Sequence, residues 1–267
     1  MNATEKTIDA KLILSILAAG IMSFSGVVVE TAMNVTFPTL MQEFGIGTST
    51  VQWITTGYLL VLASIIPASS YLKKRFPMKA LFLTAICLFI LGTVMAAAAP
   101  VFPILLTGRL IQGVGTGIAL PLMFNIVLEQ VPEERLGLMM GIASLITAMA
   151  PAVGPSLGGL IVSNWGWRMI FVALLPLLLL SLLFGAFSIR QVTETQKATF
   201  QTGEYLLLVL GFACLIFATS LASGSGWTSA PVLLLFLASL LALALFCRCS
   251  LRAQTPLINL RVFRRGP

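Results

Sequence analysis

Long apolar stretches separated by short polar segments dominate the pattern of the chain. A membrane core about 30 Å thick is crossed by a helix of about 20 apolar residues, and eight stretches are long enough to cross it. The pattern therefore predicts an all-α integral membrane protein with eight transmembrane helices. The predicted helices cover residues 12–37, 51–72, 79–99, 102–127, 137–161, 169–188, 205–222 and 231–248.

The longer polar segments divide these eight helices into a group of six and a group of two. Residues 1–11 form a polar N-terminal tail, and residues 12–189 form a bundle of six helices with very short external connections. A polar linker, residues 190–204, leads to two additional transmembrane helices within residues 205–249. Residues 250–267 are basic and are expected to lie along the cytoplasmic surface of the membrane.

Basic residues are concentrated in alternate loops. Fourteen of the sixteen Lys and Arg residues fall in the N-terminal tail, in every second connection or in the C-terminal segment, and only Arg109 and Arg168 do not. Because loops rich in Lys and Arg stay on the cytoplasmic side, we predict a multi-pass protein of the cytoplasmic membrane with both termini cytoplasmic. The loop between the second and third helices is the most basic and contains Lys73, Lys74, Arg75 and Lys79.

The composition fits a membrane protein and excludes several other classes. Hydrophobic residues make up 58% of the chain and charged residues 9%, whereas a soluble domain carries about 25% charged residues. The net charge of +7 suits a lipid bilayer surface, so no nucleic-acid partner is expected. The chain has no histidine, no phosphate-binding G-x-x-x-x-G-K-[ST] loop and no C-x-x-C pair. We therefore predict no catalytic residue, no metal site and no enzyme.

Glu30 lies deep in the first predicted helix, where an ionised side chain costs at least about 2.5–3.5 kcal/mol. It is therefore a functional candidate, and a structural ion pair between helices is the alternative. At 100° per residue, one polar face that should line a cavity contains Ser23, Gly26, Glu30, Asn34 and Phe37. Because desolvation disfavours the carboxylate, this group can bind a proton or a cationic solute, but both together only with difficulty. Such competition is the simplest route to proton/substrate exchange.

Arg109 is the second charge inside a predicted span. It shares a narrow face of the fourth helix with Gln112 and Thr116, and Gly113 and Gly117 lie beside that face. A guanidinium group does not lose its proton in proteins, so Arg109 would modulate a carboxyl group or hold a water chain. The alternative is that the side chain extends toward the outer membrane interface, because Arg109 lies near the start of its helix.

The fifth predicted helix has a face of small residues. At helical spacing this face contains Ala143, Thr147, Ala150, Gly154 and Gly158. Pro151 and Pro155 interrupt the backbone hydrogen bonds, and Gly159 follows the last small residue. The pattern predicts a bent and tightly packed helix that acts as a gate or rocking surface.

Together these residues resemble the major facilitator superfamily, and more narrowly its fourteen-helix drug:proton antiporter family. The fifth helix is similar to the antiporter motif, in which Ala150 replaces a glycine. The matching positions are Gly141, Ala150, Gly154, Pro155, Gly158 and Gly159. The run RLIQGVG in the fourth helix resembles the R-x-x-Q-G-x-G pattern. The run ETAMNVTFP in the first resembles acid-x-T-x-x-N-V-x-x-P at Thr31, Asn34, Val35 and Pro38, with Glu30 as the acid, directly before Thr31 instead of two places before it. The runs QWITTGYLL and WRMIF, which open the second and sixth helices, are also familiar there.

The resemblance implies a six-helix N-terminal bundle of 3+3 inverted repeats around a midplane cavity, followed by two additional helices. It also implies proton-coupled multidrug efflux, in which lipophilic or cationic small molecules exchange for protons. The proton gradient would be the energy source, without a cofactor. The proton-coupling and substrate residues would be Glu30, Asn34, Arg109 and Gln112.

Two features depart from the family pattern. In the loop SYLKKRFPMK, Ser70 and Lys74 replace a glycine and an acidic residue, and Pro77 replaces a second glycine. The usual acid-mediated gating contact is therefore missing or made in another way. The chain also ends at Pro267, after a run that resembles the segment before a ninth helix. We expect the N-terminal part of a larger transporter, without its second bundle unless a homodimer supplies one.

Two other functions remain open from the sequence. One is a nutrient-uptake symporter on the same fold, against which the fifth-helix motif and the two additional helices argue. The other is a truncated, non-transporting membrane scaffold. This second alternative depends on the missing second bundle, because alternating access needs two bundles that move against each other.

Overall fold

The structure is a computed structural model that describes residues 8–191, 195, 200–253 and 257–258. Within these residues the secondary structure is helical, without strands, and it provides eight helical segments long and apolar enough to span a membrane. The predicted all-α membrane fold is therefore confirmed. The helices are α1 (Ala10–Val35), α2 (Phe37–Phe44), α3 (Thr48–Val51), α4 (Trp53–Arg75), α5 (Met78–Ala97), α6 (Phe102–Gln130), α7 (Glu133–Trp165), α8 (Arg168–Ser188), α9 (Thr202–Ser225) and α10 (Ala230–Arg252).

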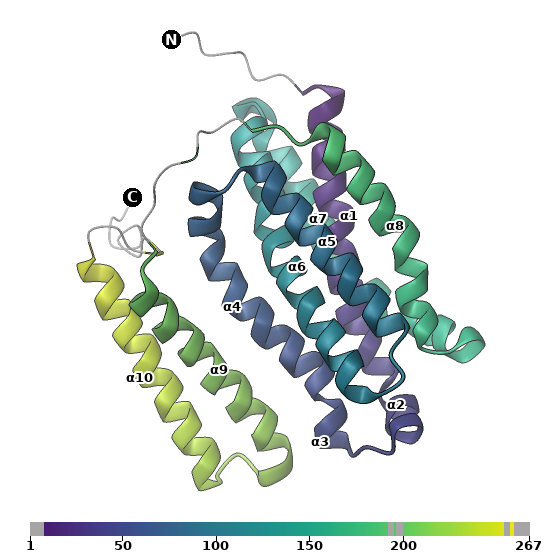
Figure 1. Cartoon of the computed structure of the whole chain (residues 1–267). Helices are drawn as coiled ribbons and strands as arrows, with labels where there is room; N and C mark the ends of the chain where they lie inside the picture. Colours follow the sequence, from purple (N-terminus) through teal and green to yellow (C-terminus); the bar gives the residue numbers. More distant parts are fainter. Residues whose placement is uncertain (1–7, 192–194, 196–199, 254–256, 259–267) are drawn as a thin grey trace.

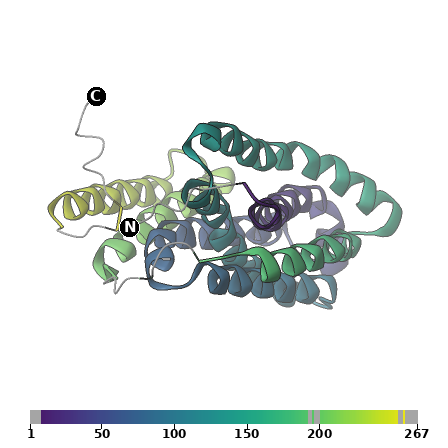
Figure 2. The same cartoon turned by 90° about the horizontal axis from the view of Figure 1, so that it is seen from above.

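Six of the long helices form a bundle, and α9 and α10 form a hairpin beside it (Figure 1). Helix α1 packs against α6, α7 and α8, while α6 also packs against α5 and α4. The hairpin contacts the bundle through α9, which packs on α4, and α10 lies against α9 (Figure 2). This arrangement places α1 and α6, the two helices with charges in their membrane-spanning parts, side by side.

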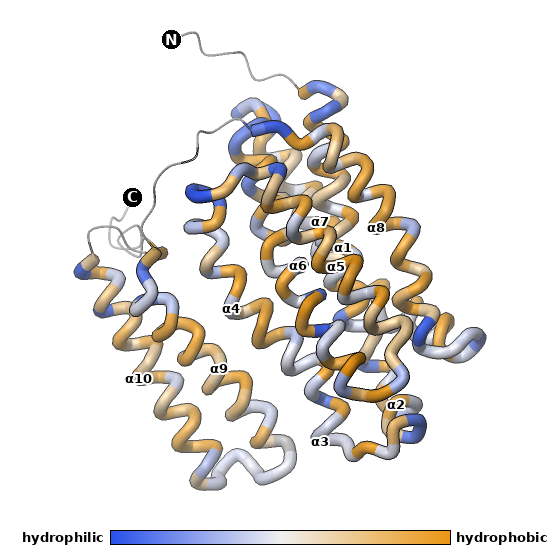
Figure 3. Tube along the Cα trace, viewed as in Figure 1, coloured by the Kyte–Doolittle hydropathy of each residue, from blue (hydrophilic) through white to orange (hydrophobic). Residues whose placement is uncertain are grey.

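The start of α1 and the end of α10 lie at the same end of the molecule (Figure 1). The α4–α5 and α6–α7 turns lie there too, and α2 and α3 lie at the opposite end. Apolar residues cover the length of the helices, and hydrophilic residues gather near their ends (Figure 3). An even number of spans, as the charge pattern predicts, produces this arrangement.

The first predicted helix stops two residues earlier than expected. Helix α1 ends at Val35, and α2 begins at Phe37. Pro38 has no backbone N–H and cannot continue the hydrogen bonds of α1. The backbone N–H and the hydroxyl of Thr36 both donate to the carbonyl oxygen of Met33, at 3.0 and 2.7 Å. Phe37 therefore belongs to α2, and its predicted place on the polar face of α1 is wrong.

A polar and aromatic cluster fixes α2 against the α7–α8 turn. Glu43 accepts a hydrogen bond from the indole of Trp167 at 2.7 Å and pairs with Arg168 at 2.7 Å. Arg168 also donates to the carbonyl oxygen of Ala99 at 2.9 Å, which ties the α5–α6 turn to the same point. The rings of Trp167 and Phe44 meet edge to face. Trp167 and Arg168 stand out in the sequence, but no sequence signal marks Glu43 as their partner.

This cluster predicts a stability that depends on pH. The hydrogen bond from Trp167 lowers the pKa of the Glu43 carboxyl; partial burial opposes this change, and Arg168 adds to the lowering. The stabilisation is therefore complete above the ordinary glutamate range of about 4.3, and it is lost as pH falls through the lowered pKa of the folded protein. Thermal unfolding in detergent should show an acid-side loss of stability that Glu43→Gln reduces. Equal acid sensitivity in both proteins would contradict this, and Glu134→Gln on the exposed first turn of α7 is the control.

Candidate functional site

A fully buried polar network surrounds Arg109 on α6. The guanidinium Nη1 donates to Oε1 of Gln112 at 2.8 Å, and Nε2 of Gln112 donates to the hydroxyl oxygen of Thr93 on α5 at 2.8 Å. Arg109, Gln112 and Thr116 are all 0% exposed, so the predicted shared face exists and points into the bundle. The alternative in which Arg109 extends to the membrane interface is wrong, because its partners hold the side chain inside.

Tyr58 on α4 contacts both Arg109 and Thr116 of this network. The guanidinium carbon of Arg109 lies 4.2 Å from the centre of the Tyr58 ring, which places the cation over the aromatic face. The Tyr58 hydroxyl lies 3.0 Å from the carbonyl oxygen of Gly26 on α1 and 2.8 Å from the hydroxyl oxygen of Thr116. One buried tyrosine thus connects α1, α4 and α6 around the guanidinium.

Glycines on α6 allow its neighbours to come this close. An added Cβ at Gly113 would lie 3.2 Å from the Tyr58 carbonyl oxygen, and one at Gly117 would lie 2.7 Å from the Cβ of Ile65. On the other side, Gly108 meets Gly92 of α5, where an added Cβ on either would come within 3.0 Å of the other's carbonyl oxygen. Gly113 and Gly117 thus admit a neighbouring helix, which is α4.

Glu30 lies on α1, one turn after Gly26, and is partly buried. Among the described residues, Glu30 and Arg109 do not come within ion-pair distance, although they are close enough for their charges to interact. Nε and Nη2 of Arg109 find no acceptor in the described part of the protein. The alternative in which Glu30 forms a structural ion pair with Arg109 is thus not realised here.

The predicted polar face of α1 changes its environment along the helix. Ser23 and Gly26 are buried, Glu30 is half-buried and Asn34 is exposed. The Asn34 amide oxygen accepts a hydrogen bond from the Thr55 hydroxyl of α4 at 3.0 Å. The structure therefore brings Arg109 and Gln112 into direct contact and places Glu30 and Asn34 one turn apart on the adjacent helix.

The small-residue face of α7 packs against α1. The buried residues of α7 are Ala143, Ala150, Gly154 and Gly158, which are four of the five residues predicted for this face. An added Cβ at Gly154 would collide with the Thr31 hydroxyl and lie 2.9 Å from the Val28 carbonyl oxygen, while one at Gly158 would lie 2.9 Å from the Cβ of Ala32. Helix α7 is thus in contact with α1 at the residue next to Glu30.

The other residues of the α7 pattern are less buried, although a Cβ added to Gly159 would lie 4.0 Å from the Val35 side chain of α1. Gly141 and Pro155 are exposed, Gly159 is half-buried, and the half-buried Thr147 donates to the carbonyl oxygen of Ser144 at 2.9 Å. Helix α7 continues through both Pro151 and Pro155 over its 33 residues. The role of this surface as a gate stays a prediction.

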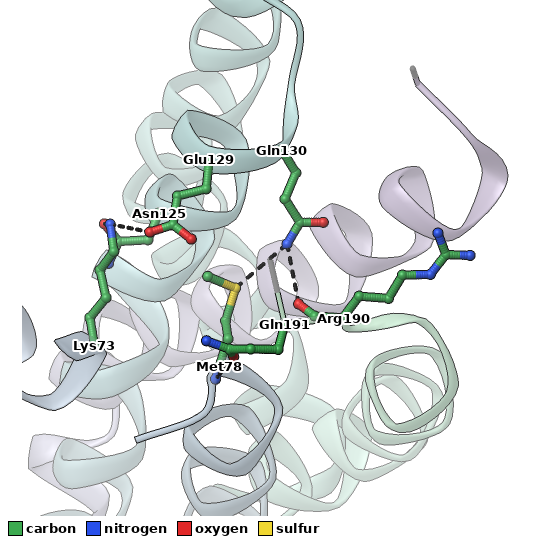
Figure 4. A network of polar contacts seen from close by, with 7 residues as sticks. All are labelled: Lys73, Met78, Asn125, Glu129, Gln130, Arg190 and Gln191. Atoms are coloured by element: carbon green, nitrogen blue, oxygen red, sulfur yellow. Dashed lines mark hydrogen bonds and ion pairs between the residues drawn. The ribbon is translucent and has the colours of Figure 1, made fainter. Parts of the chain in front are cut away.

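The basic end of α4 is joined to α6 (Figure 4). Lys73 pairs with Glu129 at 2.5 Å and donates to the amide oxygen of Asn125 at 3.3 Å. Lys74, Arg75 and Lys79 are exposed. The sequence leaves open whether the acid-mediated gating contact of this loop is missing or made in another way. The structure shows an ion pair between α4 and α6 at this end, and a role of this pair in gating stays a prediction.

A second set of polar contacts joins the helices at this end of the bundle, near the end of α8 (Figure 4). The side-chain amide of Gln130 donates to the carbonyl oxygen of Arg190 at 3.4 Å, and the backbone N–H of Met78 donates to Gln191 at 2.6 Å. Arg190 also pairs with Asp9 before α1, at 3.1 Å. These contacts link the ends of α1, α5, α6 and α8.

The fold and the site together are those of a polytopic membrane protein with ionisable residues inside its spans, which mark a functional site by default. The chain belongs to the Major Facilitator Superfamily, whose sequence pattern matches residues 19–259. The resemblance noted in the sequence is confirmed at this level.

Curated relatives carry names that refer to drug resistance. The lincomycin resistance protein LmrB of Listeria monocytogenes is 43% identical over 253 residues, which cover 95% of this chain and 53% of the relative. The multidrug resistance protein B homolog of Mycobacterium tuberculosis is 32% identical over 236 residues, which cover 88% of this chain and 44% of the relative. The chain thus spans about half the length of the curated relatives that it matches.

Solved structures show the same fold at low identity. The human organic anion transporter MFSD10 aligns with a TM-score of 0.59 and 14% identity, over 84% of this chain and 58% of that one. A POT family transporter in complex with a thioalcohol-conjugated peptide aligns with a TM-score of 0.61 and 16% identity, over 91% of this chain and 53% of that one. The chain therefore shares its fold with these two solved transporter structures.

Proposed function

We propose that the chain is the N-terminal part of a drug:proton antiporter of the fourteen-helix type. It would export lipophilic or cationic small molecules across the cytoplasmic membrane, with both termini in the cytoplasm. The observation that carries the proposal is the half-buried Glu30 beside the buried Arg109 network. The names of the relatives, which refer to lincomycin and multidrug resistance, support a drug as the substrate.

In the proposed mechanism, Glu30 binds either a proton or the substrate. A protonated carboxyl is neutral and cannot attract a cation, so binding of a proton releases a cationic solute, and binding of the solute releases the proton. Arg109 does not lose its proton in proteins and supplies a constant positive charge near Glu30. Because Glu30 is not locked in an ion pair with Arg109, the carboxyl stays available for both ligands.

The proton gradient supplies the free energy for such an exchange. A one-to-one exchange with a monovalent cation moves no net charge and is driven by the pH difference alone, whereas exchange with a neutral solute is also driven by the membrane potential. A proton that moves inward gains about 2.3 kcal/mol per 100 mV, before any pH term. At one-to-one coupling with a neutral solute, this corresponds to a concentration ratio of about fifty. The proposed cytoplasmic orientation of the Lys73 end rests on the accumulation of basic residues in the loops there.

Inside-out membrane vesicles that contain the complete transporter, of which this chain would be the N-terminal part, provide the test. With an acidic interior, addition of ethidium or lincomycin should release protons from the vesicles, and nigericin, which collapses the pH gradient, should abolish accumulation of the drug. Vesicles without the protein are the control. Proton movement driven by a sugar would instead support the uptake symporter. Drug accumulation that nigericin does not change, or no transport of either kind, would contradict the proposal.

A further inference from the structure

A recess of about 350 Å³ lies where the α9–α10 hairpin meets the bundle. One wall comes from the start of α4 and the residues before it, with Ser49, Gln52 and Trp53. The other wall comes mainly from the last turns of α9, with Phe217 and Gly224 among its residues. The recess is at the end of the molecule where α2 and α3 lie, next to the α9–α10 turn (Figure 1).

The walls combine aromatic and neutral polar groups. The rings of Trp53 and Phe217 meet edge to face with centres 5.2 Å apart, and Phe217 is 38% exposed. The side chains of Ser49, Gln52 and Ser225 add hydroxyl and amide groups, and no residue of the lining is ionisable. The volume lies within the range of about 300–1,000 Å³ that is typical of small-molecule sites. The recess therefore has the size and chemistry of a site for an uncharged ligand.

One residue that lines the recess, Gly224, has no side chain that could fill it. A Cβ added to Gly224 would meet no atom within 4 Å, so a larger side chain fits at this edge of the recess without a collision. Helix α9 has a second glycine with the same property, Gly203, in its first turn at the other end of the helix. The two positions form a matched pair for an experiment.

We propose that this recess is a binding site for an uncharged amphipathic small molecule with an aromatic ring. The ring would pack against Trp53 and Phe217, where aromatic pairs prefer offset or edge-to-face contacts, and its polar group would face the amide of Gln52 and the serine hydroxyls. A cationic compound would lose its hydration here without gaining a counter-charge. This site is separate from Glu30 in both location and charge preference, and its occupation does not require a proton gradient.

The test measures binding of dansylamide, an uncharged aromatic probe, to the purified full chain in lipid nanodiscs without any gradient. Saturable binding is expected for the wild type and for Gly203→Leu, and Gly224→Leu should weaken it at least tenfold. Dansylcadaverine, which carries a positive charge, should show no loss of binding in Gly224→Leu. Helical content and thermal unfolding of both leucine variants show whether they are folded.

Phe217→Ala provides a second route if Gly224→Leu does not fold, with Phe187→Ala, at an 80% exposed position on α8, as its control. A tenfold loss for Phe217→Ala alone would support the site. Equal binding by both members of either pair would overturn it. An absence of saturable binding in nanodiscs, with binding only in detergent, would mean that lipid fills the recess and would also overturn it. Failure of proton-coupled efflux would contradict the proposed function but would not change these binding results.

Discussion

Replacement of Glu30 by glutamine is expected to abolish substrate-coupled proton movement and to leave the protein folded in the membrane. Glutamine has nearly the same shape as glutamic acid but carries no titratable proton, so the exchange step loses its carrier. The fold should survive because, among the described residues, Glu30 takes part in no ion pair. We expect a fall of proton release to the background of empty vesicles, measured after addition of ethidium.

Two matched variants make this result specific. Glu30→Asp keeps a carboxyl at this position, and it should retain coupling. Glu134→Gln removes an exposed carboxyl from the first turn of α7 and should behave as the wild type. Coupled proton release that persists in Glu30→Gln would remove Glu30 from the mechanism, whatever the behaviour of the controls.

Substitution of Gly154 by valine is expected to destabilise the bundle strongly, whereas the same change at Gly141 should be tolerated. An added side chain at Gly154 collides with Thr31 and approaches the backbone of Val28, which cannot turn away as a flexible side chain can. Overpacking of this kind costs typically about 1–3 kcal/mol. At Gly141, on the same helix, an added Cβ meets nothing within 4 Å.

Thermal unfolding of the two variants in detergent, together with their yield from membranes, measures this difference. Because both positions belong to the same motif and both substitutions introduce the same residue, differences in helix propensity between them are small. A lower unfolding temperature for Gly154→Val alone would confirm the close contact of α7 with α1. Equal stability of the two variants would show that α7 does not pack on α1 through this glycine.

Periodic features of the sequence predicted the fold well. Runs of apolar residues identify the spans, and helical spacing correctly places Arg109, Gln112 and Thr116 on one buried face. The same spacing identifies the face of α7 that packs inward. These predictions succeed because each depends on residues within a single helix, whose geometry fixes their relative directions.

Contacts between helices were not predictable in this way. Tyr58 meets Thr116 across 58 positions of sequence, and Glu43 meets Trp167 across 124. No local period relates such residues, so their contacts depend on how whole helices dock.

The misplaced Phe37 has a different cause. Pro38 cannot continue the hydrogen bonds of α1, so α1 ends at Val35 and Phe37 begins α2. The functional roles of Glu30, Asn34, Arg109 and Gln112 stay predictions.

The buried network around Arg109 also bears on how the protein is made. A helix with an arginine in its apolar part inserts at a cost of about 2.5–3.5 kcal/mol at the helix centre, unless other groups in the membrane receive the charge. The Tyr58 ring lies on α4 and Thr93 lies on α5. Both helices precede α6 in the chain, so a ribosome delivers them to the membrane first. Helix α6 therefore enters a bilayer that already contains the Tyr58 ring, which contacts its guanidinium, and the Thr93 hydroxyl, which binds the Gln112 partner of that guanidinium.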